Sequence, residues 1–261
     1  MDNKKITNSG LRDIQLVELE ILKEVDKICC KNNIKYSIGY ESILGAVRHQ
    51  GFIPWDDDID ILMLREEYEK LKEVMNIKLN SKGYFFQDNE TNSNYRWGYG
   101  KIRKVGTSYI RQGQEHIKCQ DGILIYIFPL DGISACKIYQ TLQDYWCAFL
   151  MKILWSEVGK YNETNKIKRL IYRALSRITK EWVFKQQGNM IFKKDTKDVR
   201  YLLFTYTGKH SGKNKRSVYG FDKKWMQDLI EINFEQEKFW TIKEYNKCLK
   251  LLYGNYLQLS S

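Results

Sequence analysis

The sequence predicts an α+β fold in which helices flank a mixed β-sheet. Apolar residues recur near helical spacing over residues 10–31, which predicts an amphipathic helix near the start of the chain. Short runs rich in β-branched and aromatic residues then alternate with helical patterns up to residue 128, as expected of layers that pack together. From about residue 137 to residue 195 the strand signals disappear, and the chain becomes helical, aromatic and basic.

The elements that follow the first helix are short. We expect a strand at residues 35–38, a helix that Ser42 caps, an acidic strand at 58–64 and a helix at 66–75. Further strands are predicted at residues 84–87, 97–103, 107–111 and 123–128. The last of these is almost continuously apolar, which is typical of a central strand that is buried on both faces.

The domain organisation is predicted from the change in composition near residue 137, where strand signals disappear. We expect residues 1–135 to form the core, residues 136–200 a helical, basic and aromatic-rich insertion, and residues 201–261 a segment that packs back on the core. In that last segment a strand region is predicted at 234–241 and a closing helix at 242–252, after an exposed loop at 211–215.

The positive charge is concentrated in one segment. The chain carries a formal charge of +11, and residues 151–220 hold 17 basic against 5 acidic residues, whereas the remainder sums to −1. Such a block attracts polyanions, although a solvated basic surface without a dedicated partner is the simpler interpretation. A nucleic-acid-binding role, for which interleaved aromatic residues would suit single strands, is the least favoured alternative.

We hypothesise that this block makes peripheral contact with anionic lipid of an inner membrane leaflet. An apolar stripe next to it would suit an interfacial helix, although a stripe at this spacing is more often core. The stripe consists of Trp146, Phe149, Leu150, Ile153 and Leu154. The strongly apolar stretches 123–130 and 148–155 are far shorter than the roughly 20 residues that span a bilayer. With six cysteines, no CxxC pair and no leader pattern, a cytoplasmic protein with reduced thiols is expected.

Four aspartates in five positions, Asp56 to Asp60, predict a metal site. Alternation along a strand would place Asp58 and Asp60 on one face about 7 Å apart, with Asp56 joining them and Asp57 pointing away. Carboxylates at this spacing repel one another unless a cation neutralises them, and oxygen ligands suit Mg²⁺ or Mn²⁺. An acidic turn without a metal is the simple alternative, and an EF-hand is disfavoured because its glycine and terminal glutamate are missing.

A phosphate-binding position is predicted upstream of this strand. The helix that Ser42 opens could bind phosphate through its free amides and dipole, with Arg48 on the same helix. A lone serine at a helix start is usually only a cap.

Three stretches of the chain closely resemble the LicD-type phosphotransferases, which are relatives of the fukutin group within the nucleotidyltransferase superfamily. The resemblance rests on LGAVRHQGFIPWDDDID at 44–60, GILIYIFPLD at 122–131 and LYGNY at 252–256, together with KIR at 101–103. It implies a nucleotidyltransferase-like fold. It also implies metal-dependent transfer of a phospho-alcohol group, typically phosphocholine from CDP-choline, to a sugar of a teichoic acid, lipopolysaccharide or capsule precursor that can be lipid-linked.

The resemblance assigns roles to individual residues. Asp58, Asp60 and Arg48 are the expected catalytic residues, and Asp56, Asp58 and Asp60 the expected metal ligands. Residues expected to bind substrate are Ser42, Glu41, Lys101, Arg103 and Tyr126.

The chain departs from the family pattern at two places. Tyr40 and Glu41 stand where two glycines usually precede the phosphate-binding turn, and Tyr126 stands where an aspartate is usual. Asp121 or Asp131 could replace that carboxylate; alternatively, the protein is a degenerate member that binds nucleotide or glycan without turnover. A further interpretation is that Tyr126 forms a cage for a quaternary ammonium group with other aromatic residues, although ordinary strand packing is the simpler one. The other cage residues would be Tyr95, Trp97 and Tyr99.

Overall fold

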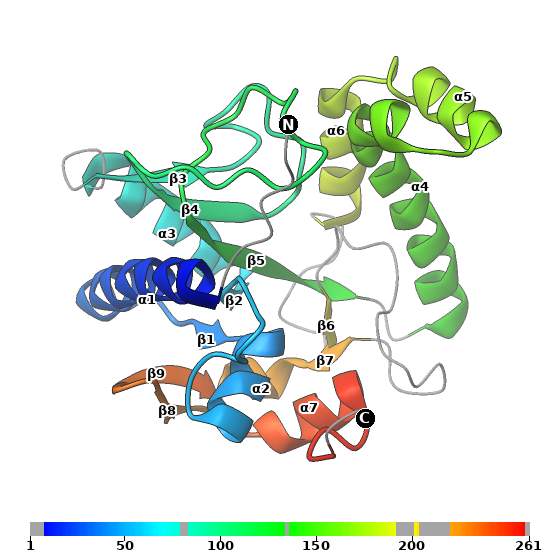
Figure 1. Ribbon diagram of the computed structural model, residues 1–261. Coiled ribbons are helices and arrows are strands. Elements are labelled where there is room, and N and C mark those ends of the chain that lie inside the picture. Colours follow the sequence, from blue (N-terminus) through cyan, green and yellow to red (C-terminus); the bar gives the residue numbers. More distant parts are fainter. Residues whose placement is uncertain (1–7, 79–82, 134–135, 192–200, 204–219, 259–261) are drawn as a thin grey trace.

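The computed structural model describes residues 8–78, 83–133, 136–191, 201–203 and 220–258. Its centre is a mixed sheet in the order β1-β2-β5-β4-β3, in which β2 and β5 run parallel and the other neighbours antiparallel (Figure 1). The strands are β1 (Ser37–Ile38), β2 (Asp60–Leu64), β3 (Tyr84–Gln87), β4 (Gly100–Lys104) and β5 (Leu124–Ile133). The expected α+β fold with a mixed sheet flanked by helices is confirmed.

Two helices, α1 (Asn8–Lys31) and α3 (Arg65–Lys78), cover the same face of this sheet. From α1, Glu20 accepts a hydrogen bond from the Tyr84 hydroxyl at 2.7 Å, and from α3 the Tyr68 ring packs on Phe86 at 5.7 Å. Tyr84 and Phe86 alternate onto one face, so the opposite face remains for other contacts. That opposite face carries the residues of the candidate site.

The core follows from the apolar residues between the sheet and these helices. Leu22, Leu71, Ile61, Ile125 and Ile127 are at most 1% exposed. This placement confirms β5 as a central buried strand, and it anchors β5 between β2 and β4, which also carry candidate site residues.

Several predicted boundaries are wrong. Ser42 is not a helix cap, because α2 (Tyr40–His49) begins two residues earlier with Gly39 at its N-cap. The acidic strand begins at Asp60 and not at Asp58. Residues 107–111 form no strand, because β4 ends in a turn at Gly106 (φ 81°) and the chain continues as a loop. The Thr107 hydroxyl then accepts a hydrogen bond from the Ile123 amide at 2.9 Å, which closes the loop at its base.

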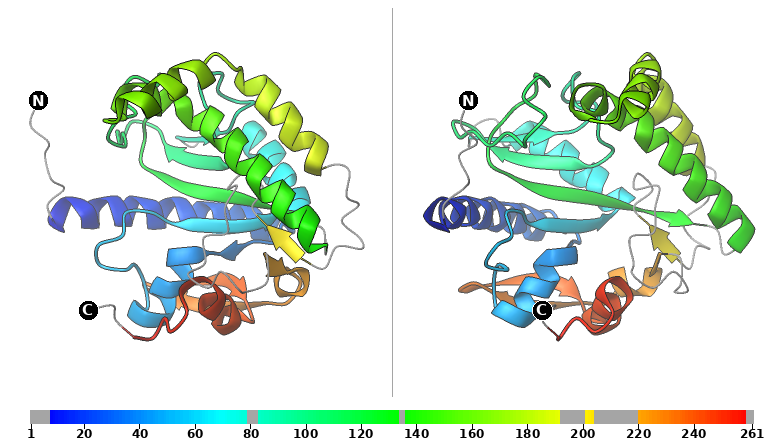
Figure 2. Two further views of the ribbon diagram at one scale, coloured as in Figure 1. Left: turned by 90° about the vertical axis from the view of Figure 1, so that its right-hand side faces the viewer. Right: turned by 45° about the vertical axis from the view of Figure 1, so that its right-hand side comes forward.

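The predicted helical insertion is helical in its described part, up to residue 191. It forms α4 (Lys137–Asn162), α5 (Lys166–Leu175) and α6 (Lys180–Ile191), which stand beside the sheet (Figures 1 and 2). The apolar stripe is buried in one part and exposed in another. Leu150, Ile153 and Leu154 are buried with Val183 of α6, whereas Trp146 and Phe149 remain more than one-third exposed. The three-part division of the chain stays a prediction.

The C-terminal part contains more strands than the sequence indicated. Short strands β6 (Tyr201–Leu203) and β7 (Phe221–Asp222) extend the sheet beyond β5, and a 3₁₀ turn η2 (Lys223–Met226) follows. The predicted single strand region is a hairpin of β8 (Leu229–Phe234) and β9 (Glu237–Ile242), and α7 (Tyr245–Tyr253) closes the chain. The predicted loop at 211–215 lies outside the described residues.

Candidate active site

The aspartates group in the turn that leads into β2. One carboxylate oxygen from each of Asp56, Asp57 and Asp58 lies within 4.8 Å of the others. The prediction that Asp57 points away is therefore wrong, because the chain is not yet an extended strand at these positions. Asp60 begins the strand and is only 6% exposed. We call these four residues the acidic cluster.

The start of α2 holds the acidic cluster in place. The Asp60 amide donates to the Ser42 hydroxyl at 2.9 Å, and the Gly39 amide donates to the Asp60 carbonyl at 2.8 Å. From α1, the Gln15 side-chain amide donates to the Asp56 carbonyl at 2.9 Å. Ser42 thus binds the backbone of the acidic strand in this structure, and its predicted role toward phosphate stays a prediction.

Burial, and after it the crowding of like charges, raises the pKa of Asp56, Asp58 and Asp60. Burial, followed by repulsion from Asp58 and Glu41, raises the pKa of Asp56 to about 7. Burial raises the pKa of Asp60 well above its usual range, and Asp58 and Glu41 add to the effect. Carboxylates this close and this costly to ionise together are the arrangement that a cation stabilises.

Glu18 of α1 is a further acidic residue at this place, and sequence reasoning missed it. It is 1% exposed, and its Oε2 atom has no hydrogen-bond partner among the described residues. Burial, then the neighbouring aspartates of the cluster, raises its pKa to about 10. The available signal was the presence of Gln15 and Glu18 on the apolar face of an amphipathic helix, where a polar residue needs a reason.

These observations fit a hard divalent cation. The group offers only carboxylate oxygens, and its charges repel one another. Glu18, whose Oε2 atom has no partner among the described residues, is close enough for the aspartates to raise its pKa. Asp56, Asp57 and Asp58 bring oxygens close enough to share such an ion, and Asp60, one of the expected ligands, lies beside this group. Mg²⁺ or Mn²⁺ at this place stays a prediction.

The loop that follows β4 reaches over the acidic cluster. The Tyr109 hydroxyl donates to Asp57, and the Arg111 guanidinium pairs with Asp58 at 2.8 Å. Arg111 thereby places a cation beside the carboxylates that sequence reasoning did not predict. Arg48 itself lies in the last turn of α2, six residues or about 9 Å along the helix from Ser42, and forms no ion pair with a described residue.

Tyr40 and Glu41, which stand where the family pattern has two glycines, affect the backbone and the charge at the start of α2. Tyr40 has φ 43°, a left-handed conformation that glycine adopts freely and that a bulky residue rarely adopts. Its ring packs edge-on against Phe128 at 5.5 Å. Glu41, which belongs to the same departure, adds negative charge to the cluster and interacts with the Tyr253 hydroxyl at the end of α7.

Across the sheet, Asp60, Tyr126, Lys101 and Gln87 form one row on the open face. The strand register pairs Asp60 with Tyr126, Tyr126 with Lys101, and Lys101 with Gln87. Adjacent strands lie about 4.8 Å apart, so Lys101 starts about 10 Å from Asp60 along the row. Arg103 follows on the same face and donates to the Gln87 side-chain oxygen at 2.8 Å.

The two carboxylates suggested as replacements for an aspartate at position 126 have other partners. Asp131 receives two hydrogen bonds from Arg65, at 2.9 and 2.8 Å, five residues further along β5. Asp121 accepts a hydrogen bond from the Ser108 hydroxyl at 2.8 Å within the loop. Neither belongs to the acidic cluster that the described residues form.

Comparison with known proteins identifies the segment that carries most of this site. Residues 33–120 match the LicD/FKTN/FKRP nucleotidyltransferase domain. They form a LicD-family nucleotidyltransferase domain. The whole chain is also similar to the lipopolysaccharide cholinephosphotransferase LicD of Haemophilus influenzae, with 27% identity over 98% of this chain and 93% of the relative. An uncharacterized protein of Rickettsia prowazekii is 43% identical over 28% of this chain and 26% of its own length.

The LicD-family domain and the site coincide in part. The matched segment contains α2, the acidic cluster, Lys101, Arg103 and Arg111. Glu18, Tyr126 and Tyr253 lie outside it, and the fold brings them to the same site. The matched segment therefore supplies most of the candidate site, and residues before and after it supply the rest.

Proposed function

We propose that this protein is a metal-dependent transferase that moves a phospho-alcohol group from a CDP-alcohol to a sugar of a cell-surface glycan precursor. The acidic cluster carries the proposal, because its crowded carboxylates lie within the matched LicD-family segment. The similarity to a lipopolysaccharide cholinephosphotransferase over nearly the whole chain supports phosphocholine as one candidate group and lipopolysaccharide as one candidate acceptor.

The chemistry would be an in-line displacement at phosphorus. A sugar hydroxyl loses its proton and forms a bond to the phosphorus that carries the alcohol, while the bond from this phosphorus to CMP breaks. A bound divalent ion would shield the charge of the phosphates. The protein's own contribution is to position the reactants and to place the Arg111 cation beside the carboxylates, 2.8 Å from Asp58.

The rival proposal is a degenerate LicD-family protein that binds without turnover. It is motivated by Tyr126, whose ring lies between the Arg111 guanidinium at 5.2 Å and the Lys101 ammonium at 5.3 Å, where the family pattern has an aspartate. Purified protein incubated with Mg²⁺, a panel of CDP-alcohols and a glycan acceptor separates the two. Release of CMP that needs both metal and acceptor supports the transferase, and binding of a CDP-alcohol without CMP release supports the rival.

We also infer that the protein works at the inner surface of a membrane. No helix in the described part of the chain has the length and apolar character to cross a bilayer. However, α4 and α5 expose large apolar side chains, which we call the α4–α5 surface. These are Ile138, Leu142, Tyr145, Ile167, Leu170 and Ile171, each at least 53% exposed.

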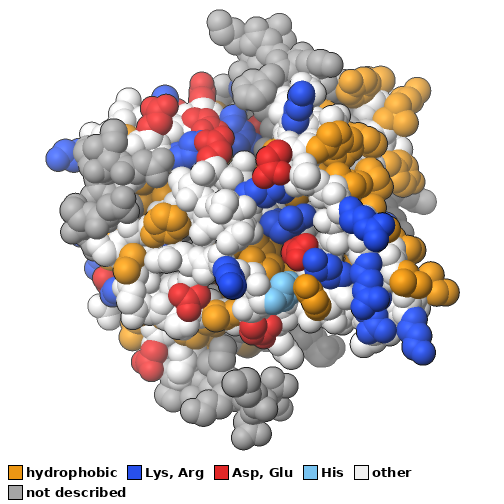
Figure 3. Space-filling view, turned by 90° about the horizontal axis from the view of Figure 1, so that it is seen from above, with side chains coloured by type: hydrophobic (Ala, Val, Ile, Leu, Met, Phe, Trp, Pro, Cys, Tyr) orange, Lys and Arg blue, Asp and Glu red, His pale blue; other side chains and the backbone are white. Residues whose placement is uncertain are grey.

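An anionic lipid surface is the partner that fits the α4–α5 surface best. Exposed Lys166, Lys168 and Arg173 flank the apolar residues of α5, and no ion pair joins them to any described residue. Figure 3 shows hydrophobic and basic side chains gathered together on the side of the molecule that these helices form. Apolar residues beside unpaired basic residues are the pattern of an interfacial helix.

Liposome flotation tests this inference. The protein should float with vesicles that contain anionic lipid and not with neutral vesicles, and Ile167→Asp should abolish flotation because it places a charge in the apolar face. Leu257→Asp is the matched control, since Leu257 is 68% exposed outside this surface. Equal flotation of all three proteins, or none on anionic vesicles, would rule out the proposed contact.

A further inference from the structure

The cage of aromatic rings predicted around Tyr126 already contains a cation of the protein. The Lys101 ammonium lies 5.4 Å from the Tyr95 ring centre, 5.0 Å from Trp97, 5.9 Å from Tyr99 and 5.3 Å from Tyr126. All four rings therefore face one positive charge that the chain supplies itself. A quaternary ammonium group could enter this cage only by displacing Lys101.

Lys101 and its neighbour Arg103 are buried without an acidic partner. Lys101 is 4% exposed and Arg103 is 6% exposed. Arg103 donates to the Gln87 side-chain oxygen and to the Gly122 carbonyl, both of which are neutral, and neither cation has an ion pair within the described residues. Burial of two like charges without a counter-ion is costly, and an anion bound beside them would lower that cost.

Burial and like charge also act on the titration of Lys101. Burial, then repulsion from Arg103 and Arg111, holds its pKa well below the usual range of lysine. An anion bound next to the ammonium would oppose both effects by stabilising the charged form.

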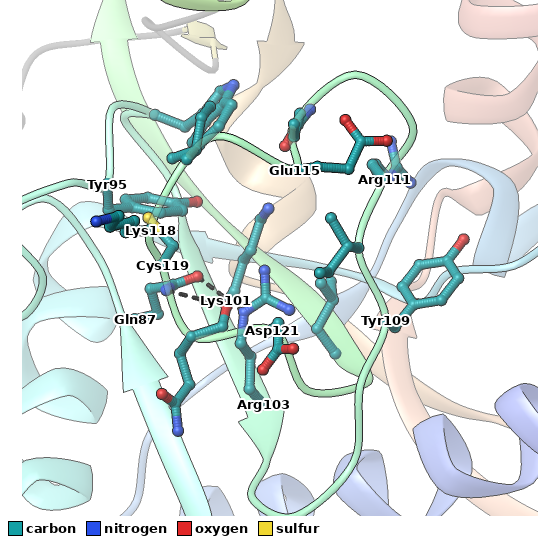
Figure 4. A pocket seen from close by; sticks show the side chains of 16 residues that line it. Gln87, Tyr95, Lys101, Arg103, Tyr109, Arg111, Glu115, Lys118, Cys119 and Asp121 are labelled. Carbon is teal, nitrogen blue, oxygen red and sulfur yellow. Dashed lines mark hydrogen bonds between the residues drawn. The ribbon is translucent and has the colours of Figure 1, made fainter. Parts of the chain in front are cut away.

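A cavity opens beside these two cations. It has a volume of about 190 Å³, and Arg111 and Lys118 also line it. Figure 4 shows Lys101 and Arg103 side by side, with the loop that carries Tyr109, Arg111, Lys118 and Asp121 around them. Four basic residues thus line the cavity against two acidic ones, Glu115 and Asp121. We call Lys101, Arg103, Arg111 and Lys118 the basic pocket.

Tyr126 explains why Lys101 has no acidic partner. The register places residue 126 directly opposite Lys101 on the neighbouring antiparallel strand. Directly opposed side chains lie close enough to interact, so an aspartate at position 126 would pair with the lysine. With tyrosine at this position, the ammonium packs over a ring and its charge remains available to a ligand.

We propose that Lys101 and Arg103 bind a phosphate group of a substrate in the basic pocket, about 10 Å from the acidic cluster along the same sheet face. This inference rests on the proposed function and makes it more specific. The group in the pocket is an anion and not a quaternary ammonium group, and it belongs either to the nucleotide donor or to a phosphorylated sugar acceptor. Arg111 connects the two places, because it pairs with Asp58 and also lines the pocket.

Binding titrations without divalent metal test this proposal separately from turnover. Inorganic phosphate, CMP, glucose 1-phosphate and choline would be titrated into the protein with EDTA present, with intrinsic tryptophan fluorescence or calorimetry as the readout. We expect saturable binding of phosphate and of at least one of the two phosphate esters, and none of choline. Binding of CMP alone would assign the pocket to the donor, and binding of glucose 1-phosphate alone to the acceptor.

Three variants complete the test. Lys101→Met should weaken phosphate binding at least tenfold, and Tyr126→Asp should do the same because its carboxylate pairs with the lysine. Lys104→Met is the matched control on the same strand, since Lys104 points to the other face and pairs with Glu20 at 2.5 Å. Thermal unfolding confirms that each variant is folded.

The outcomes that overturn the proposal are specific. They are the absence of saturable phosphate binding to the wild-type protein, equal binding by Lys101→Met, or choline binding to the wild-type cage. Loss of CMP release with phosphate binding intact would instead count against the proposed function alone.

Discussion

The open face of the sheet has an acidic end and a basic end. At each end, groups of like charge are held close together or buried, which disfavours their charged forms. At the β2 end, Asp56, Asp58 and Asp60 crowd together, and the pKa values of all three are raised. At the β4 end, Lys101 and Arg103 are buried side by side, and both pKa values are lowered. Like charges gathered at the two ends of one row are the basis of both proposals, a cation at one end and a phosphate at the other.

The largest effect should come from removing one charge at the acidic end. Asp58→Asn and Asp60→Asn should each lower transfer, measured as CMP release, by at least about 100-fold, because a metal ligand is lost. Both variants should keep a melting temperature at or above that of the wild type without metal, since each removes like-charge repulsion. Retained activity in both variants would contradict the assignment of the metal site.

The next prediction concerns the residue that joins the two ends. Arg111→Met should lower kcat/KM about tenfold, since Arg111 pairs with Asp58 and lines the basic pocket. Stability should change by less than about 1 kcal/mol, because the pair is partly exposed. Arg12→Met is the matched control: Arg12 pairs with Glu235 at the same distance, 2.8 Å, with similar exposure, and its side chain also contacts Gln15 at 3.2 Å but not an aspartate of the cluster. Equal activity of the two variants would contradict a role for Arg111 in transfer.

The sequence predicted the acidic end far better than the basic end. Asp56 to Asp60 stand next to one another in the chain, so their chemistry was visible without a fold. Lys101, Arg111 and Tyr126 come from two strands and a loop, and only strand register brings them together. The loop after β4 was predicted as a strand because of its residue types, which hid the contacts of Tyr109 and Arg111 with the cluster.

The helices and strands were predictable where local pattern decides them, and less so where tertiary contacts do. The buried face of α1 follows its apolar spacing, yet the reason for Glu18 on that face appears only when the acidic cluster is placed beside it. The local sequence predicts Ser42 as a helix cap. In the structure its hydroxyl instead accepts a hydrogen bond from the Asp60 amide, 18 residues further along the chain. Such contacts between distant segments cannot be derived from local spacing.

A smaller effect is expected on stability as a function of pH. In the folded protein Asp56 keeps its proton up to about pH 7, whereas in the unfolded chain the pKa of this carboxyl is near its ordinary value of 3.8. The folded state therefore binds the extra proton in this window, and stability of the metal-free protein falls as pH rises from about 4 to about 7. The melting temperature with EDTA should be higher at pH 6 than at pH 8, and Mg²⁺ should reduce or reverse this difference. A melting temperature that rises with pH in EDTA would contradict the crowding of these carboxylates.

The smallest effect should be the difference in stability between Tyr40→Gly and Tyr40→Ala. Both variants lose the ring and its contact with Phe128, so that loss cancels between them. Glycine adopts the left-handed backbone at φ 43° freely, whereas alanine does not, so Tyr40→Gly should be the more stable of the two by about 1 kcal/mol, or roughly 2–4 °C in melting temperature. Equal stability of the two variants in denaturant unfolding would contradict a backbone cost at this turn.

The central claim is that the acidic cluster holds a divalent metal, and a titration with Mn²⁺ followed by electron paramagnetic resonance tests it most directly. The wild-type protein should bind Mn²⁺ saturably, and Mg²⁺ should compete for the site. Asp58→Asn and Asp60→Asn should each lose this binding, while Asp13→Asn, a control at an exposed position of α1, should keep it. Equal Mn²⁺ binding by all four proteins, or no saturable binding by the wild type, would contradict the account.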